Sequence, residues 1–155
     1  MENSVRQMAT LHAICGLPGS GKSTLAEKLA RDLRCVSLSA DEWAIQIFGN
    51  FYNEPGHLAI EKLHWELGKK LLAAGLDVVL DNGFWTKERR SWHRSEVEMI
   101  GARWHLHYLD VPVAQLKDRL ATRNQPLPSN SFHITGSDLD ACVAIFEPPD
   151  SAELR

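Results

Sequence analysis

Short apolar runs alternate with amphipathic segments along most of the chain. The apolar runs, which are partly β-branched, have the length of buried strands and cover residues 11–15, 35–38, 77–80 and 103–109. Between them, apolar residues recur at a spacing of three or four, which predicts helices over 22–33 and 55–74.

Capping and proline signals predict three more helices. One is expected after Thr86 and one after Pro112, whose fixed φ suits a first helical turn. Another is expected at Thr135, because Thr135 and Asp138 have the spacing of a capping box. The alternation predicts an α/β fold, with a parallel sheet covered by helices on both faces. Such sheets bind ligands at the carboxyl ends of their strands.

Residues 124–131, NQPLPSNS, have no regular periodicity, and their two prolines exclude both helix and strand. This pattern predicts a surface loop. A loop of this kind is either a plain connection or a lid over a site, and here the lid is placed at about residues 119–136.

Residues 16–23, GLPGSGKS, match the pattern G-x-x-x-x-G-K-[ST] between a predicted strand and a predicted helix. Glycines in such a loop let successive N–H groups turn inward and form an anion cradle at the helix N-terminus. The residues expected to bind the phosphates are Gly16, Pro18, Gly19, Ser20, Gly21, Lys22, Ser23 and Thr24.

Three of these residues have individual roles. Lys22 is expected to reach the β and γ phosphates, and Ser23 to give its hydroxyl to Mg²⁺, which prefers oxygen ligands. Thr24 either assists the start of the helix or contacts the α phosphate.

Two acids follow predicted strands. Asp41 is interpreted as a base that accepts a proton from an attacking hydroxyl, with a helix N-cap as the alternative role. Ser39 is an equally good N-cap. Asp81 has the form of an acid that binds Mg²⁺ through water, with a turn-forming role before Asn-Gly as the alternative.

Arg119 and Arg123 lie four residues apart, and therefore on one helix face beside the predicted loop. Their guanidinium groups are expected to neutralise charge on a transferring phosphoryl group. The alternative is an exposed helix face with Asp118 nearby.

The composition narrows the class of protein. A chain of 155 residues with 44% apolar residues is long enough to bury one core, so a single domain over residues 1–155 is expected. The net charge of −3 favours a small substrate over long duplex DNA or an anionic membrane. Three cysteines without CxxC spacing predict neither a disulfide framework nor a zinc site. No run is apolar enough for a signal peptide or a membrane span, so a cytoplasmic location is expected.

Other polar residues give weaker signals. His105 and His107 have strand spacing but no third ligand nearby, so packing or surface roles are expected rather than metal binding. Arg89 and Arg90 either line an acceptor pocket or begin a solvated helix. Glu147 either touches the nucleotide or ends the last helix before two prolines.

The segments GLPGSGKST, SADEW, LDNGFW, HYLDVP and LKDRLATRN resemble those of small predicted ATP-binding kinases of bacteria (AAA_33-like). Their P-loop kinase group includes polynucleotide 5′-kinases, chloramphenicol phosphotransferases and zeta-type toxins. The resemblance covers about residues 10–150 and implies a three-layer P-loop NTPase fold. It also implies that the acid at Asp41 is the general base or positions the acceptor hydroxyl, and that Arg123 contacts the donor phosphates.

Two further comparisons refine this expectation. LDNGF resembles the LDGFP segment of adenylate kinases, in which the acid matching Asp81 organises magnesium. Kinases of the group commonly have a fifth strand after the lid, whereas this chain has no apolar run beyond Phe146. A four-stranded sheet of order 2-3-1-4 is therefore expected, and the base preference stays open.

The sequence thus predicts an ATP- and Mg²⁺-dependent phosphotransferase that moves the γ-phosphoryl group to a hydroxyl of a small molecule. Two alternatives remain: a polynucleotide 5′-hydroxyl kinase, which the acidic balance disfavours, and a non-catalytic ATP-binding regulatory module. The chain has no N-K-x-D segment of the kind that reads guanine.

Overall fold

The computed structural model describes residues 8–50, 52–129 and 131–155. Its strands are β1 (Thr10–Cys15), β2 (Val36–Ser39), β3 (Val78–Gly83) and β4 (Arg103–Tyr108). Its helices are α1 (Lys22–Leu33), α2 (Ala40–Phe48), α3 (Glu54–Ala73), α4 (Lys87–Met99), α5 (Val113–Arg123) and α6 (Gly136–Ile145). In the described residues the strands pair in parallel in the order β2-β3-β1-β4, which confirms the predicted fold class and strand order.

The predicted helices are present, and the capping box at Thr135 and Asp138 forms as expected. Helix α2 was not predicted. It follows β2 without a linker, because the Ser39 side chain accepts a hydrogen bond from the N–H of Glu42 and so caps the helix. Ala40 and Ala44 lie one helical turn apart on its buried face, and two such small residues give little periodic signal in the sequence.

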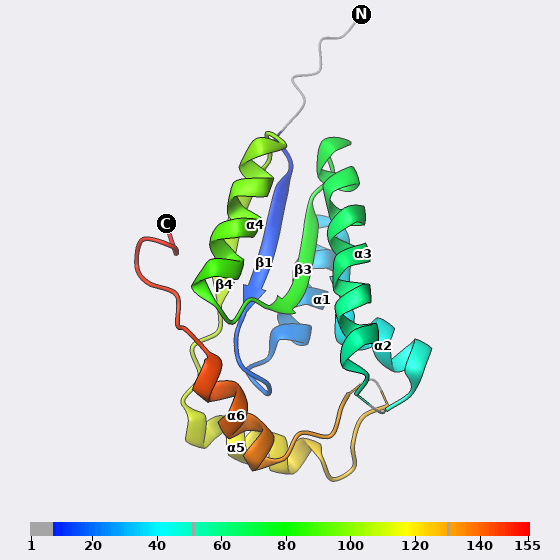
Figure 1. Ribbon diagram of the computed structural model, residues 1–155, viewed down its shortest axis with the longest axis vertical. Coiled ribbons are helices and arrows are strands. Elements are labelled where there is room, and N and C mark those ends of the chain that lie inside the picture. Colours follow the sequence, from blue (N-terminus) through cyan, green and yellow to red (C-terminus); the bar gives the residue numbers. More distant parts are fainter. Residues whose placement is uncertain (1–7, 51, 130) are drawn as a thin grey trace, which may run out of the picture.

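Helices cover both faces of the sheet (Figure 1). The larger core lies between the sheet and helices α3 and α4, where Trp65, Phe84 and Val97 pack against strand residues such as Leu11 and Leu80. On the opposite face, Ala26 of α1 packs against Ile14 and Val79. The sheet is therefore buried at its centre on both faces, as a parallel sheet requires.

Helices α5 and α6 lie beyond the carboxyl ends of β1 and β3 (Figure 1). Leu116 and Leu120 of α5 and Leu139 of α6 form a smaller apolar cluster with Leu17 of the loop after β1. This cluster joins the two helices to the phosphate-loop segment, and residues 124–134 connect them without helix or strand in the described positions. The predicted loop is thus confirmed at residues 124–129 and 131, whereas Asn130 lies outside the described residues.

The position of Arg90 contradicts the expectation that it lines an acceptor pocket or begins a solvated helix. Its side chain is 2% exposed and lines neither a pocket nor a solvated surface. The guanidinium pairs with Glu153 at 2.7 Å and donates to the carbonyl oxygens of Phe84 and Glu147. A strongly polar group is buried here because all of these acceptors surround it, and it ties the C-terminal segment to α4.

Glu147 is also explained by this segment. Its carboxylate accepts a hydrogen bond from the backbone N–H of Lys87, at the start of α4, and its own N–H donates to the Trp85 carbonyl. It lies after α6, which ends at Ile145, and acts as a structural link.

In the part of the chain that the structure describes, no helix combines the length and the apolar character needed to cross a membrane.

Candidate active site

The loop between β1 and α1 is shaped by its glycines. Gly19 and Gly21 have φ values of +82° and +96°, a left-handed region that other residues rarely adopt. A Cβ on Gly16 would lie 2.5 Å from the Oγ of Ser20, and one on Gly19 would lie 3.1 Å from Leu120 of α5. The close packing and the left-handed backbone conformation explain why the motif requires glycine at these positions.

The start of α1 is open to an anion. Gly21 is its N-cap, and among the described residues no side chain caps the helix. The first N–H groups of a helix have no partner within the helix, and they carry the positive end of its dipole. These N–H groups and those of the loop are the main-chain donors available to an anion at this end of α1.

Lys22 points back along the loop, where its Nζ donates to the carbonyl oxygen of Leu17 at 3.0 Å. Lys22 keeps part of its surface exposed, but the loss of water around its ammonium group lowers its pKa. The carboxylates of Asp81 and Asp41 act in the opposite direction, which places both acids within electrostatic reach of this lysine.

Asp81 and Ser23, the two residues predicted to hold Mg²⁺, lie beside one another. It is 9% exposed, and its Oδ2 accepts a hydrogen bond of 3.4 Å from the Ser23 hydroxyl. Strand β3 continues past it to Gly83, so Asp81 lies within the strand rather than at its end. Burial raises the pKa of Asp81 to about 6, and the nearby charge of Asp41 adds to this effect. The nearby protein groups therefore do not fully offset the cost of burying the charged carboxylate.

Asp41 is free to face the site because Ser39 takes the capping role in α2. Its side chain is 64% exposed, and its Oδ1 accepts a hydrogen bond of 2.7 Å from Nε2 of His57 on α3. This bond is the main reason why the pKa of His57 is raised. The carboxylate is therefore held by a partner that carries positive charge when protonated.

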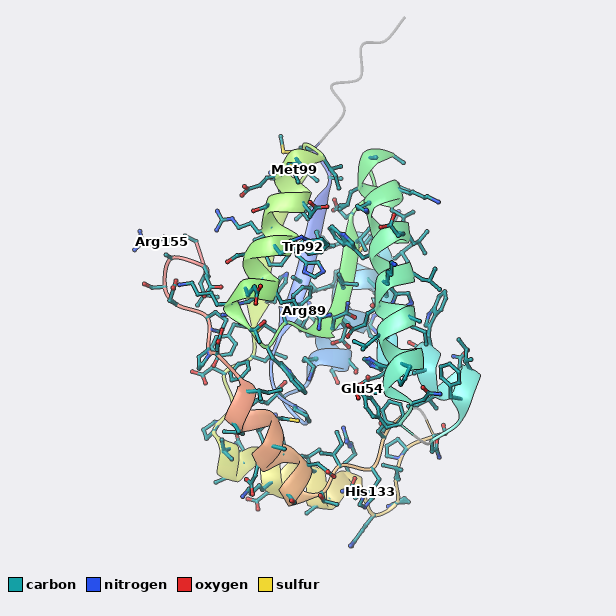
Figure 2. All side chains as sticks on the ribbon, viewed as in Figure 1. Glu54, Arg89, Trp92, Met99, His133 and Arg155 are labelled. Atoms are coloured by element: carbon teal, nitrogen blue, oxygen red, sulfur yellow. The ribbon has the colours of Figure 1, made fainter. Side chains whose placement is uncertain are left out.

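The interaction continues beyond His57. Its Nδ1 lies 3.7 Å from Glu61, whose other carboxylate oxygen accepts a hydrogen bond of 2.7 Å from Arg89 of α4. Asp41, His57, Glu61 and Arg89 thus form a chain of alternating charge, and Arg89 lies between α3 and α4 in Figure 2. Sequence reasoning missed His57 and Glu61, although their i, i+4 spacing on a predicted helix was the available signal.

Both candidate arginines of α5 line the same cavity. Arg119 donates to the carbonyl oxygen of Gly19 at 3.4 Å, and Arg123 donates to that of Phe132 at 3.0 Å. The Nε of Arg123 is buried and has no hydrogen-bond partner among the described residues. Helix α5 therefore brings two cations to the loop, one of them with an unused donor.

These residues meet around one cavity of about 880 Å³. A smaller hollow of about 80 Å³ between Ser23, Asp41, Asp81 and Arg123 adjoins it. Aromatic side chains of Tyr52, Trp85 and Phe132 also line the larger cavity. Of the predicted phosphate-binding residues, Pro18, Gly19, Gly21, Lys22, Ser23 and Thr24 line the cavity, whereas Gly16 and the buried Ser20 lie behind the loop surface.

The site fits a nucleoside triphosphate with a divalent cation. The uncapped start of α1 and the glycine loop provide main-chain donors for phosphate oxygens. Ser23 and Asp81 provide a hydroxyl and a buried carboxylate, the oxygen donors that Mg²⁺ prefers. These polar groups of the cavity thus suit phosphates and a cation, and the aromatic side chains that line it suit the planar or apolar parts of a ligand.

Comparisons with known proteins find a family match and the same fold in solved structures. The sequence model of a family described as "AAA domain" (AAA_33) matches residues 11–149. A sequence search of curated proteins finds no match.

Solved structures have the same fold at low sequence identity. Kti12 of Chaetomium thermophilum, in complex with ADP-AlF3, is 18% identical over 92% of this chain and 82% of its own, with a TM-score of 0.70. A gluconokinase from Sinorhizobium meliloti is 17% identical over 94% and 79%, with a TM-score of 0.65. The Mycobacterium tuberculosis APS kinase CysC, bound to AMPPNP and APS, is 18% identical over 93% and 85%, with a TM-score of 0.65.

Proposed function

Because the chain belongs to the AAA domain family AAA_33, a family of P-loop proteins, we propose that it is an ATP- and Mg²⁺-dependent phosphotransferase. It moves the γ-phosphoryl group of ATP to a hydroxyl of a small-molecule acceptor. One observation carries the proposal: Lys22, the Ser23–Asp81 pair, Asp41 and Arg123 converge on one cavity from four different elements. Phosphoryl transfer depends mainly on such positioning and on neutralisation of charge.

The residues divide the work according to their positions. Lys22 and the main-chain amides of Gly19 and residues 21–24 hold the phosphates, and Ser23 with Asp81 would hold Mg²⁺, which neutralises phosphate charge when bound. Arg123 and Arg119 bring positive charge to the cavity from α5, and Arg123 lines the smaller hollow together with Asp41. Asp41 accepts the proton of the acceptor hydroxyl or orients it, because it is the most exposed carboxylate of the group and faces the cavity.

The acceptor side is formed by the chain Asp41, His57, Glu61 and Arg89, together with Tyr52. These groups offer both hydrogen-bond donors and acceptors, so they suit a polar molecule with several hydroxyl groups or a charged group. The named activities of the gluconokinase and the APS kinase with the same fold are consistent with a small acceptor.

Residues 119–136 act as the lid in this proposal, within a single domain over residues 1–155. Arg123 joins α5 to Phe132 in the following loop, and Phe132 and His133 line the cavity from that loop (Figure 2 labels His133). Movement of this segment would carry Arg119 and Arg123 away from the phosphates together, which allows product release.

A transfer screen tests the function. The protein, Mg²⁺ and ATP are incubated with panels of nucleosides, sugars, antibiotics and 5′-hydroxyl oligonucleotides, and products are detected by mass spectrometry. A mass gain of one phosphoryl group on a small molecule, absent with Asp41→Asn, supports the proposal. Transfer confined to oligonucleotide ends identifies a polynucleotide kinase instead. ATP binding without transfer to any acceptor contradicts the proposal and favours a regulatory module.

A further inference from the structure

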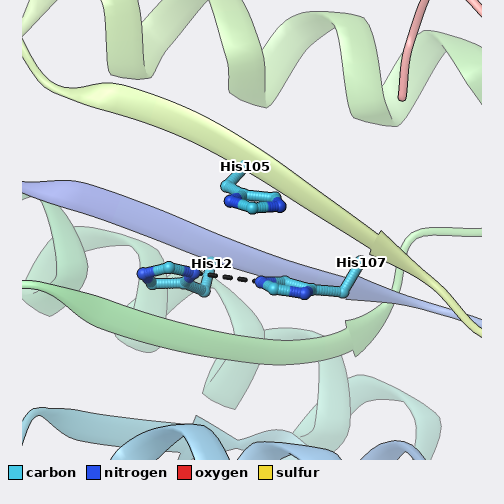
Figure 3. A group of neighbouring side chains, drawn as sticks. All are labelled: His12, His105 and His107. Atoms are coloured by element: carbon cyan, nitrogen blue, oxygen red, sulfur yellow. Dashed lines mark hydrogen bonds between the residues drawn. The ribbon is translucent and has the colours of Figure 1, made fainter. Parts of the chain in front are cut away.

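Three histidines cluster on the sheet, away from the cavity. His105 and His107 lie on β4, and His12 lies opposite His105 in the parallel pairing with the neighbouring strand β1 (Figure 3). This arrangement overturns the expectation that no third ligand lies near His105 and His107. The third histidine is 93 residues away in the sequence but comes from the adjacent strand.

All three side chains point to the face that carries α1. Side chains alternate along a strand, so His12 shares a face with Ile14, and His105 and His107 share one with Leu109. Ile14 and Leu109 both pack with residues of α1. β4 is the last strand of the described sheet, and at this edge His12 is buried, His107 half-buried and His105 exposed. The cluster is therefore anchored in the sheet but open to solvent.

The rings lie close enough to share a ligand. One nitrogen atom of each histidine lies within 4.8 Å of those of the other two. Nδ1 of His12 and Nε2 of His107 share a hydrogen bond of 3.0 Å, and the rings of His105 and His107 stack at 4.3 Å. Three nitrogens bound to one Zn²⁺ lie about 3.4 Å apart, since each Zn–N bond is about 2.1 Å. The nitrogens must therefore draw closer when a metal binds, and His105, the exposed ring, is the least enclosed of the three.

We propose that His12, His105 and His107 form a binding site for a transition-metal ion of the Zn²⁺ class, independent of the Mg²⁺ site. Imidazole nitrogen suits Zn²⁺, Ni²⁺ and Cu²⁺ rather than Mg²⁺, whose preferred ligands are oxygens. Three histidines leave a fourth position of a tetrahedral ion for water, and the exposed side of the cluster provides room for it. On binding, the metal replaces the hydrogen bond between His12 and His107.

The alternative role of the three rings is to pack against one another, and one variant distinguishes this role from metal binding. His105→Phe keeps an aromatic ring against His107 but has no nitrogen to offer a metal. Because His105 is exposed, this change leaves the buried His12 in place. His133→Ala is the control, since it removes the exposed histidine that lines the cavity and so separates Zn²⁺ binding by the cluster from Zn²⁺ binding at the cavity.

The experiment measures Zn²⁺ binding by calorimetry on untagged protein stripped of metal, in excess Mg²⁺ so that the oxygen site is filled. Wild type and His133→Ala are expected to bind one equivalent, and His105→Phe to bind at least about tenfold more weakly. The ring ¹⁵N signals of His12 and His107, recorded in long-range ¹H–¹⁵N NMR spectra, should shift when the site is saturated with Zn²⁺. Equal affinity in wild type and His105→Phe, or no binding by wild type at micromolar Zn²⁺, would overturn the proposal. The melting temperature without metal shows that His105→Phe is folded, and neither readout depends on phosphoryl transfer.

Discussion

The Oδ1 atom of Asp41 lies 2.7 Å from Nε2 of His57, and this bond joins the first turn of α2 to the first turn of α3. Ser39 and Asn53 cap these two helices, so both functional side chains are left free of capping roles. Asp41 is exposed to the cavity, whereas His57 is largely covered, with Asp41 bonded to its Nε2 and Glu61 lying 3.7 Å from its Nδ1. The histidine therefore sets the direction of the carboxylate without occupying the acceptor position itself.

Replacement of Asp41 tests the proposed base. Asp41→Asn keeps the size and shape of the side chain but removes its ability to accept a proton. If Asp41 is the base, kcat falls by at least about 100-fold, a typical contribution of general base catalysis. ATP affinity, measured by calorimetry, should stay within about twofold because the loop that holds the phosphates is unchanged. Asp32→Asn, at an exposed acid of α1, is the control. Wild-type transfer by Asp41→Asn would disprove the assignment.

His57 should act through Asp41 as a positioning residue. Its raised pKa means that the imidazolium is fully present at low pH and is lost as the pH rises through a value above the ordinary 6.5. We expect kcat/KM of the wild type to decline across that pH range because the charge that holds Asp41 is lost. His57→Gln should remove this limb of the profile and lower kcat by about tenfold, a smaller loss than removal of the base itself. An unchanged pH profile in His57→Gln would exclude the positioning role.

Lys22 should contribute to nucleotide binding. Its ammonium group donates to the Leu17 carbonyl in the described structure and is placed to exchange that bond for phosphate oxygens. A hydrogen bond between charged groups contributes about 1.5–3 kcal/mol, so Lys22→Ala should weaken ATP binding by about 10- to 100-fold. The measurement is calorimetric titration with a non-hydrolysable ATP analogue and Mg²⁺. Lys28→Ala, at an exposed position later in α1, should bind as the wild type does.

Features encoded within a few residues could be predicted from the sequence. The strands and the glycine loop depend on local patterns, and the structure has both. Contacts between distant elements could not be predicted in the same way. Nothing local in FWTKERR distinguishes Arg89, which reaches the cavity, from Arg90, which the C-terminal segment buries.

The histidine cluster falls between these cases. The predicted order 2-3-1-4 already placed the first and fourth strands side by side. Parallel alignment of those strands pairs His12 with His105, so the cluster followed from the predicted topology together with the register. The register itself depends on how the strands pack, and a shift of one residue would have moved the histidines to opposite faces.

The burial of Arg90 predicts a large effect on stability. Arg90→Met fills a similar volume but removes the cation that pairs with Glu153 and the N–H groups that donate to two carbonyl oxygens. Removing one partner of a buried ion pair costs about 3–5 kcal/mol, and urea unfolding should show a loss of that size. Arg94→Met is the matched control on α4. Its ion pair with Glu98 is exposed, so a change within about 1 kcal/mol is expected. Equal losses in both variants would contradict the structural role of Arg90.

His93 should make the fold less stable in acid. Its ring packs against Trp65 and Phe84, and burial lowers its pKa to about 4. Below pH 6.5 the unfolded chain therefore binds a proton at this residue that the folded chain does not accept until about pH 4. The free energy of unfolding should fall by up to about 3 kcal/mol between these pH values because of His93. Asp81 acts in the opposite direction, because its raised pKa lets the folded protein bind a proton first. The contribution of His93 is thus the difference between the pH profiles of wild type and His93→Gln in urea unfolding. That difference should grow steadily as the pH falls from 6.5 to 4 and be constant above pH 7. Parallel profiles over the whole pH range would show that the core does not hold His93 neutral.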